Sequence, residues 1–279
     1  VLSYLLIFGR LGLPALGVRG TAIATCAARW LECGILVAGT YLGRSPTAAR
    51  IGQMLSFDRA FLGRFLKTVL PVVLTEVLWS LGITTYNAVY ARMGTEEIAA
   101  FSIASTIEGL SVVPMIALGS ACAIMVGNRI GAGEERKAFD YARRFLFIGA
   151  ATAALVGTLL FFTRDPILSL YRVTATTGAY ARNLLVVVAC ALWVKTSNYT
   201  VLIGILRSGG DTRMGFLIDV GGMWLVGVPL AVVGAFILHL PVYWVVTMAM
   251  ADEVSKLAVG LRRVFSRRWI HNLARPAEG

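Results

Sequence analysis

Residues 69–92 read VLPVVLTEVLWSLGITTYNAVYAR, and this segment indicates the fold class of the chain. Almost all of it is apolar, and at 1.5 Å per residue the helix it predicts is roughly 34 Å long, enough to cross the hydrocarbon core of a bilayer. Glu76, Ser80, Thr84 and Asn87 fall at i, i+4, i+8 and i+11, which places them on one face of that helix. Facing lipid, the carboxylate and the amide would each cost on the order of several kcal/mol. We therefore expect this face to meet other helices or a water-filled cavity.

The composition of the whole chain indicates a helical membrane protein. Of its 279 residues, 57% are hydrophobic and 15% are charged, and the mean hydropathy is +0.75, whereas a soluble domain carries about 25% charged residues. The net charge of +11 does not indicate nucleic-acid binding, because the basic residues occur in alternate loops without a nucleic-acid-binding motif. The four cysteines fall in apolar stretches without zinc spacing, so we expect them to be core residues.

Apolar stretches predict an all-α polytopic helical bundle with about eight membrane segments. We expect these segments at residues 1–9, 21–42, 69–92, 98–126, 145–162, 182–206, 214–238 and 242–261. The first is too short to span a bilayer, and the chain begins inside a hydrophobic run without Met, so we expect it to lack its natural N-terminal part. Residues 43–68 are polar, and their interleaved aromatic and basic side chains predict an amphipathic helix on the membrane surface; the aromatic and leucine positions are Phe57, Phe61, Leu62 and Phe65.

Lysine and arginine are distributed unequally between the two sets of loops. Residues 43–68, the loops around 129–144 and 207–213, and the C-terminal tail hold most of them. Cytoplasmic loops carry the excess of positive charge in membrane proteins. We therefore expect a multi-pass protein of the cell (cytoplasmic) membrane, with these loops and the C-terminus in the cytoplasm.

Several charged residues lie inside the predicted spans. Arg29 and Glu32 are one turn apart, and Lys256 follows Asp252 and Glu253 at i+4 and i+3, so both sets are expected to be structural ion pairs.

The span at residues 182–206 has an unusually polar centre, Lys195 to Tyr199. Lys195 lies too deep for easy snorkelling, which leaves two interpretations: a counter-ion of Glu76 or Glu108, which we favour, or a charge that senses substrate. Glu108 is open to two interpretations, an inward-facing polar contact or a cavity ligand.

Three loops carry a family resemblance. They read VGNRIGAGEERKAFDYAR (126–143), ILRSGGDTR (205–213) and PALGVRGTAIAT (14–25), with IDVGGMWLVGVPLA (218–231) as support. Their glycines turn the chain between helices, and Asp211 or Thr212 is expected to cap the following helix. A phosphate-binding interpretation is poor, since no strand precedes the glycines and the P-loop Lys-Ser/Thr is missing. In order and spacing these loops resemble the multidrug and toxic compound extrusion (MATE) transporters.

The resemblance implies twelve helices in two six-helix lobes and the export of drugs and organic cations in exchange for Na⁺ or H⁺. On that basis we expect the last two helices of the N-lobe at residues 1–42, a cytoplasmic inter-lobe linker at 43–68, a six-helix C-lobe at 69–262 and a basic cytoplasmic tail at 263–279. The expected partners are small-molecule organic cations and membrane lipid. We expect no nucleic acid, no cofactor besides the coupling ion, no enzymatic activity, and a monomeric full-length protein.

The resemblance also implies site residues. Glu76 matches the acidic position that related members carry in the first C-lobe helix, where it contributes to cation or ion binding, which makes Glu76 a candidate Na⁺ ligand. Some members carry a further acid about ten residues before the LR of the LRSGGD loop, but here that position is Thr196. The candidate substrate- and ion-binding residues are Glu76, Ser80, Thr84, Asn87, Glu108, Lys195, Asn198 and Tyr199.

Other functions would need different residues. A lipid-linked precursor flippase of the wider superfamily would favour a basic cavity. An intramembrane enzyme would need a catalytic pair, and the two histidines, His239 and His271, both fall in loops. In a membrane scaffold or an inactive fragment, Glu76 would serve only to hold helices together through hydrogen bonds.

Overall fold

The computed structural model describes residues 2–9, 16–43, 48 and 58–271. This part of the chain is almost entirely helical and holds no strand, as the sequence predicts. The chain divides into two compact units, residues 1–63 and 64–279. The helices, with π-helical segments written η, are α1 (Leu2–Phe8), α2 (Gly17–Leu42), α4 (Arg59–Met93), α5 (Thr95–Ser111), α6 (Val113–Gly131), α7 (Glu135–Leu168), α8 (Ala175–Tyr199), η1 (Thr200–Arg207), α9 (Thr212–Gly222), η2 (Met223–Gly227), α10 (Val228–Val232), η3 (Val233–Ile237), α11 (Val242–Ala249) and α12 (Ala251–Phe265).

In the first unit, α1 packs against the start of α2. The backbone N–H of Leu16 donates to the carbonyl of Leu6 at 2.9 Å, and Leu6 and Ala24 are buried. The rest of α2 is largely exposed. Arg29 Nη1 lies 2.8 Å from Glu32 Oε2, which confirms the predicted ion pair.

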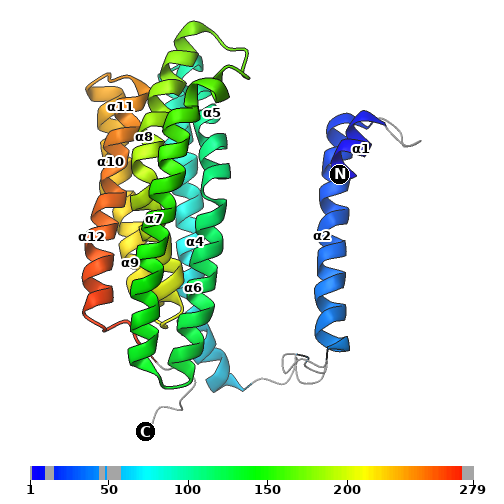
Figure 1. Cartoon of the computed structure of the whole chain (residues 1–279), viewed down its shortest axis with the longest axis vertical. Helices are drawn as coiled ribbons and strands as arrows, with labels where there is room; N and C mark the ends of the chain where they lie inside the picture. The colour runs from blue at the N-terminus through cyan, green and yellow to red at the C-terminus, as the bar shows by residue number, and fades with distance from the viewer. Residues whose placement is uncertain (1, 10–15, 44–47, 49–57, 272–279) are drawn as a thin grey trace. The chain divides into compact units, whose positions relative to one another are not determined.

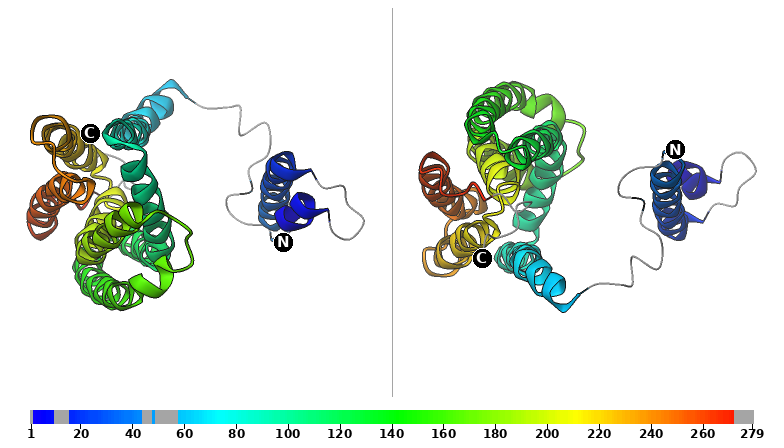
Figure 2. Two further views of the ribbon diagram at one scale, coloured as in Figure 1. Left: turned by 90° about the horizontal axis from the view of Figure 1, so that it is seen from above. Right: turned by 90° about the horizontal axis from the view of Figure 1, so that it is seen from below.

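The second unit is a helical bundle organised around α8 and its continuation η1 (Figure 1). These two segments pack against α5, α6, α7, α11 and α12. Figure 2 looks along the helices and shows α7 in green and α12 in red on different sides of the unit. Two clusters of buried residues form the core, one including Leu184, Leu185, Leu192 and Val245, the other including Cys122, Val126, Val201, Ile205 and Trp269.

Two expected spans are interrupted. The sequence predicts one helix over residues 98–126, but the chain breaks at Val112 between α5 and α6. Pro114 lies in the first turn of α6, where its missing N–H costs no helical hydrogen bond. The expected span at 242–261 breaks at Met250, and α12 then begins with Asp252 and Glu253 in its first turn, where carboxylates stabilise the positive end of the helix dipole.

Two other helices also differ from the expectation. Helix α4 begins at Arg59, ten residues before the predicted span, so residues 59–68 continue into the span. Residues 44–47 and 49–57 of the predicted surface segment, including Phe57, lie outside the described residues. Segments α9, η2, α10 and η3 form one continuous helix, and η2 ends directly before α10, in which Pro229 cannot donate a backbone hydrogen bond.

The loops of the resemblance turn the chain largely as predicted. Gly133 and Gly210 have φ of 77° and 83°, which glycine adopts without steric cost. Of the two residues expected to cap the next helix, Asp211 lies at the N-cap position, but its side chain makes no cap hydrogen bond. Its Oδ2 instead accepts a hydrogen bond from Arg263 Nε at 2.6 Å, which ties this loop to α12.

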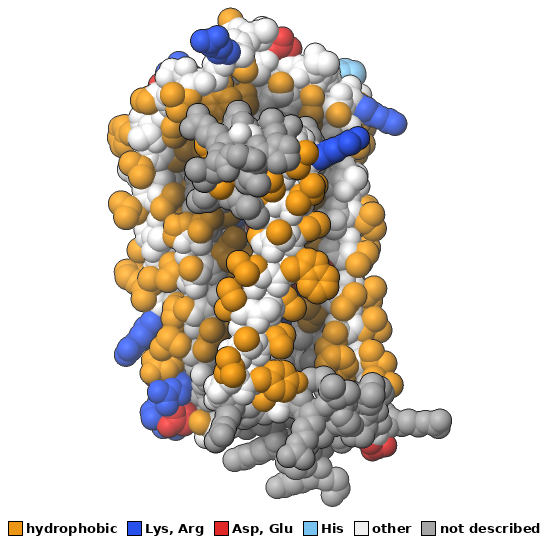
Figure 3. Space-filling model, turned by 90° about the vertical axis from the view of Figure 1, so that its right-hand side faces the viewer, with side chains coloured by type: hydrophobic (Ala, Val, Ile, Leu, Met, Phe, Trp, Pro, Cys, Tyr) orange, Lys and Arg blue, Asp and Glu red, His pale blue; other side chains and the backbone are white. Residues whose placement is uncertain are grey.

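Six helices of the described chain are long and apolar enough to cross a membrane. They are Arg19–Leu42, Phe65–Met93, Val113–Gly131, Glu135–Leu168, Ala175–Arg207 and Thr212–Ile237. The predicted count of eight is not confirmed, since α1 has seven residues and the last span is split. In Figure 3, hydrophobic side chains cover most of the face in view and charged ones gather toward its two ends. Side chains such as Phe147, Phe162 and Leu225 are at least 74% exposed, which suits contact with lipid better than with water.

Candidate functional site

A cavity of about 720 Å³ lies within the second unit. This volume falls in the range of small-molecule sites, about 300–1,000 Å³. Its lining comes from α4, α5, α6, α8, η1, α9, η2, α11, α12 and the breaks at Val112 and Met250. The larger apolar and aromatic lining residues are Trp79, Tyr86, Tyr90, Phe101, Met115, Tyr199, Met223 and Met250, and the charged ones are Glu76, Glu108, Lys195, Arg207, Asp219, Asp252, Glu253 and Lys256.

The structure brings most of the predicted site residues to this cavity. Those that line it are Glu76, Asn87, Glu108, Lys195, Asn198 and Tyr199. Ser80 and Thr84 do not line it; both are exposed, and Thr84 Oγ1 donates to the Ser80 carbonyl at 2.9 Å. The polar stripe of α4 therefore lies at the edge of the face that meets the cavity.

The centre of that face is an aromatic row that the sequence analysis missed. Trp79, Tyr86 and Tyr90 follow one another on α4 at helical spacing and line the cavity. The rings of Tyr86 and Tyr90 are nearly parallel, with centroids 6.3 Å apart, and Phe101 lies 4.4 Å from Tyr90. Aromatic faces attract cations through their quadrupole, so this wall suits an organic cation. Aromatic residues at helical spacing are equally typical of a lipid-facing or core surface, so no sequence signal set these apart.

Glu76 pairs with a residue that the sequence analysis placed in a cytoplasmic loop. Arg207, the last residue of η1, approaches Glu76 Oε1 with its Nη2 at 2.9 Å. The Glu76 side chain is 59% exposed. This carboxylate is therefore accessible within the cavity while it holds its counter-ion.

Lys195 is the counter-ion of Glu108. Its Nζ donates a hydrogen bond to Glu108 Oε1, from α8 to α5. Of the two partners that the sequence left open for Lys195, the structure selects this one. Both side chains are at least three-quarters buried. Because each is the partner of the other, neither charge is buried without compensation.

A third charged group surrounds Lys256 of α12. Its Nζ lies 3.0 Å from Asp252 Oδ2, 3.1 Å from Asp219 Oδ1 and 3.9 Å from Glu253 Oε1. The predicted pairing within α12 is confirmed, but Asp219 of α9 joins it from another helix. Lys256 and Asp252 are almost completely buried. We call Lys256, Asp219, Asp252 and Glu253 the lysine cluster.

The charges of the cavity do not cancel. Glu76 and Glu108 each have one cationic partner, whereas three carboxylates share Lys256. With every group ionised, the lining holds five carboxylates against three cationic groups. An imbalance of this sign in a low-dielectric site favours the binding of cations.

Three buried polar atoms at the cavity have no hydrogen-bond partner among the described residues. They are Tyr86 Oη, Thr196 Oγ1 and Asn198 Oδ1. Gly227 of η2 leaves room for two of the cavity side chains: a Cβ at this position would lie 2.0 Å from Tyr86 Oη and 3.1 Å from Asp252 Cγ. Both side chains therefore lie close against the η2 backbone. Within the described chain, no three His, Cys, Asp or Glu side chains are arranged to hold a metal ion. Glu76, the candidate Na⁺ ligand, lines the cavity but belongs to no such group.

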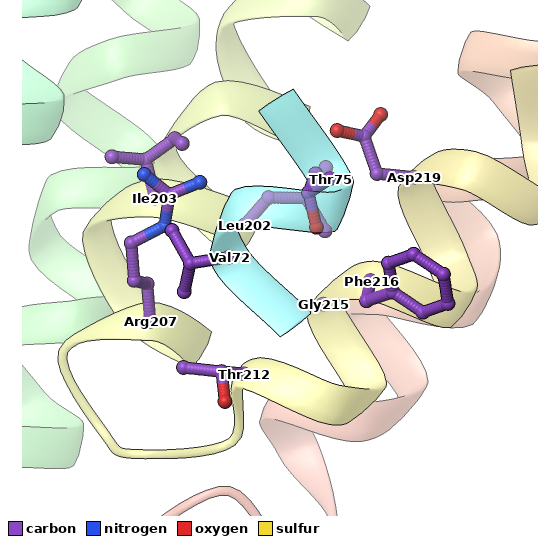
Figure 4. A pocket seen from close by; sticks show the side chains of 9 residues that line it. All are labelled: Val72, Thr75, Leu202, Ile203, Arg207, Thr212, Gly215, Phe216 and Asp219. Carbon is purple, nitrogen blue, oxygen red and sulfur yellow. The ribbon is translucent and has the colours of Figure 1, made fainter. Parts of the chain in front are cut away.

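A pocket of about 20 Å³ adjoins the cavity and shares Thr75, Leu202, Ile203, Arg207 and Asp219 with it. Figure 4 shows Arg207 and Asp219 on opposite sides of the α4 segment that carries Val72 and Thr75. The pocket has room for about one water molecule. It therefore marks a gap in packing beside α4, and the larger cavity is the candidate site.

Comparisons with known proteins agree on one family. The MatE family model matches residues 71–233, more than half of the chain. The chain is 28% identical over 230 residues to the multidrug resistance protein MdtK of Edwardsiella ictaluri and 28% identical over 233 residues to the probable multidrug resistance protein NorM of Mannheimia succiniciproducens. These matches cover 81% and 82% of the chain and 50% of each relative, so the chain spans about half the length of these relatives.

Solved structures share the fold. An outward-facing multidrug resistance MATE family transporter matches 96% of the chain with a TM-score of 0.80 and 17% identity, and 60% of that transporter is covered. The eukaryotic MATE transporter AtDTX14 matches 96% of the chain with a TM-score of 0.78 and 18% identity, and 59% of it is covered. With the matched family model, the apolar helices and the cavity, these findings place the chain in the multidrug and toxic compound extrusion (MATE) family of multi-pass membrane transporters.

Proposed function

We propose that this protein is a secondary active transporter that exports organic cations, drugs among them, by antiport with Na⁺ or H⁺. The observation that carries this proposal is the excess of carboxylates in a cavity of small-molecule size with an aromatic wall. An organic cation presents both apolar surface and positive charge, and this lining complements both. The drug-resistance names of the relatives support the same substrate class.

Glu76 is the proposed coupling carboxylate. It is the most exposed of the ion-paired acids in the cavity, and its partner Arg207 comes from a different helix. A substrate cation and a coupling ion would compete for the negative charge of Glu76. Binding of one would release the other, which couples export of the substrate to entry of the ion. As the two lobes alternate in access, Glu76 would meet each side of the membrane in turn.

The flippase alternative would favour a basic cavity, and the carboxylate excess here argues for cations instead. The proposal also places the linker and the C-terminus in the cytoplasm, because these segments belong to the set of loops that is richer in lysine and arginine. The transporter is proposed to act as a monomer in the cell membrane.

The test is efflux of a fluorescent organic cation from cells that express the complete gene product. Glu76→Gln keeps the shape and hydrogen-bonding capacity of the side chain but removes its charge, so we expect efflux to be abolished at unchanged expression. Glu97→Gln, a matched change on α5 outside the cavity lining, is expected to leave efflux intact. Wild-type efflux and ion dependence in Glu76→Gln would remove Glu76 from the mechanism. An inactive wild-type protein would remove the proposed function itself.

A further inference from the structure

The side-chain amide of Asn198 has hydrogen-bond partners for its nitrogen but none among the described residues for its oxygen. Only 4% of the residue is exposed. Nδ2 donates to the backbone carbonyl of Glu253 and to Glu253 Oε2, both at 2.7 Å. Two acceptors on one side fix which end of the amide is nitrogen. Oδ1 is therefore the free end, and it has no partner among the described residues although it belongs to a side chain that lines the cavity.

Glu253 is also incompletely satisfied. Its Oε2 accepts from Asn198, but its Oε1 lies 3.9 Å from Lys256 Nζ, beyond hydrogen-bonding distance. Lys256 directs its closer contacts to Asp219 and Asp252. The side chain of Glu253 is 22% exposed and lines the same cavity. Two acceptor oxygens, one amide and one carboxylate, are thus open at adjoining side chains.

The charged and titratable groups around this place leave the negative charge in excess. Tyr86 and Tyr90 of α4 and Lys195 of α8 line the same cavity as Asp252 and Glu253, and the two tyrosines carry no net charge at pH 7. Lys195 is already bound to Glu108 of α5, and Lys256 is shared by three carboxylates of α9 and α12. A ligand that completes the site must supply positive charge and hydrogen-bond donors together.

We propose that Asn198 and Glu253 form a subsite that selects protonated amines, which carry an N–H donor, over quaternary ammonium ions of the same shape. The inference rests on the proposed transport of organic cations and adds a substrate class to it. A protonated amine donates to Asn198 Oδ1 or Glu253 Oε1 and supplies the missing charge. A quaternary ammonium ion supplies charge alone and leaves a buried acceptor unsatisfied, which costs affinity.

The experiment compares two dansyl amides that differ only in the amine group at the end of the tail. One carries a dimethylaminoethyl tail, which is protonated at pH 7, and the other carries the trimethylammonium analogue. Both are titrated by fluorescence into the purified full-length protein in lipid nanodiscs, with potassium chloride as the salt. We expect the protonated amine to bind about tenfold more tightly, the size of one charge-assisted hydrogen bond.

Variants locate this preference. Glu253→Gln and Asn198→Leu are expected to bring the ratio of the two dissociation constants toward one. Glu97→Gln is the matched control outside the cavity lining and should keep the tenfold ratio. Thermal unfolding of each variant shows whether it is folded, and if Asn198→Leu is not, Glu253→Gln and the wild-type ratio decide.

The outcomes separate the two proposals. Equal affinity of the wild type for both amides, or an unchanged ratio in Glu253→Gln, overturns the subsite and leaves cation binding intact. Loss of amine binding when sodium replaces potassium, without preference between the two amides, identifies an alkali ion as the occupant and also overturns it. If the wild type binds neither amide, the proposed function fails along with the subsite.

Discussion

Two ion-pair clusters of this protein have opposite charge arrangements: in one, two cations surround a carboxylate, and in the other, three carboxylates surround a cation. In the loop between α6 and α7, one carboxylate, Glu134, lies 2.7 Å from both Arg129 Nη1 and Lys137 Nζ. Inside the bundle, one ammonium, Lys256, lies at 3.0, 3.1 and 3.9 Å from three carboxylates. The loop cluster has the shorter contacts, yet its Lys137 side chain is 61% exposed, whereas that of Lys256 is 3% exposed.

Burial, rather than contact distance, decides what each cluster contributes to stability. Water screens the loop charges and solvates either partner when the other is removed. The lysine cluster has no such alternative, so each group depends on the others for its solvation. We therefore expect the loop cluster to tolerate substitution and the lysine cluster to be sensitive to it.

The largest expected effect comes from removing the cation of the lysine cluster. Lys256→Met leaves three carboxylates facing one another in the bundle, and we expect a loss of about 3–5 kcal/mol in the free energy of unfolding. Sodium dodecyl sulfate titration of the purified protein in mixed micelles measures this loss. Lys137→Met removes a cation from the exposed cluster and should cost much less. Equal losses in the two variants would contradict the role given to burial.

The second prediction compares the two one-to-one pairs of the cavity by double-mutant cycles. Glu108 and Lys195 are mostly buried, so we expect Glu108→Gln and Lys195→Met to be coupled by about 2 kcal/mol. Glu76 is more than half exposed, so Glu76→Gln and Arg207→Gln should be coupled by less than about 1 kcal/mol. The same unfolding titration provides both values. A stronger coupling at Glu76 would show that the cavity excludes water around that pair.

The sequence predicted those features of the site that depend on neighbours along one helix. Helical periodicity brought Glu76 and Asn87 to the cavity, and the i+4 rule paired Lys256 with Asp252. Contacts between distant helices were not available to such reasoning. Arg207 lies 131 residues from Glu76 in the sequence, and Asp219 contacts Lys256 from another helix, α9. The position of Arg207 in a loop and of Asp219 in a span did not predict either contact.

The fold shows the same limit. Apolar length predicted the helical membrane protein, and the resemblance in three loops predicted the family, as the matched family model confirms. The break at Val112 was missed because apolar residues continue across it. The break at Met250 was missed although Asp252 and Glu253 mark the start of α12. Ser80 and Thr84 were misplaced because the cavity face of α4 centres on Trp79 and Tyr86, about one position from the polar stripe.

The smallest expected effect concerns pH and the exposed cluster. Hydrogen bonds from Lys137 and Arg129 hold the pKa of the Glu134 carboxyl below its ordinary value of about 4.3. A carboxyl with a lowered pKa in the folded state stabilises that state above its unfolded pKa, and the stabilisation is lost as pH falls through the folded value. The difference in unfolding temperature between wild type and Glu134→Gln should therefore be small at pH 7 and vanish toward pH 3. Glu97→Gln, at which neither of these cations is paired, provides the matched comparison. A difference for Glu134→Gln that grows as the pH falls would mean that protonated Glu134 stabilises the fold, and the loop cluster would then not be an ion pair in function.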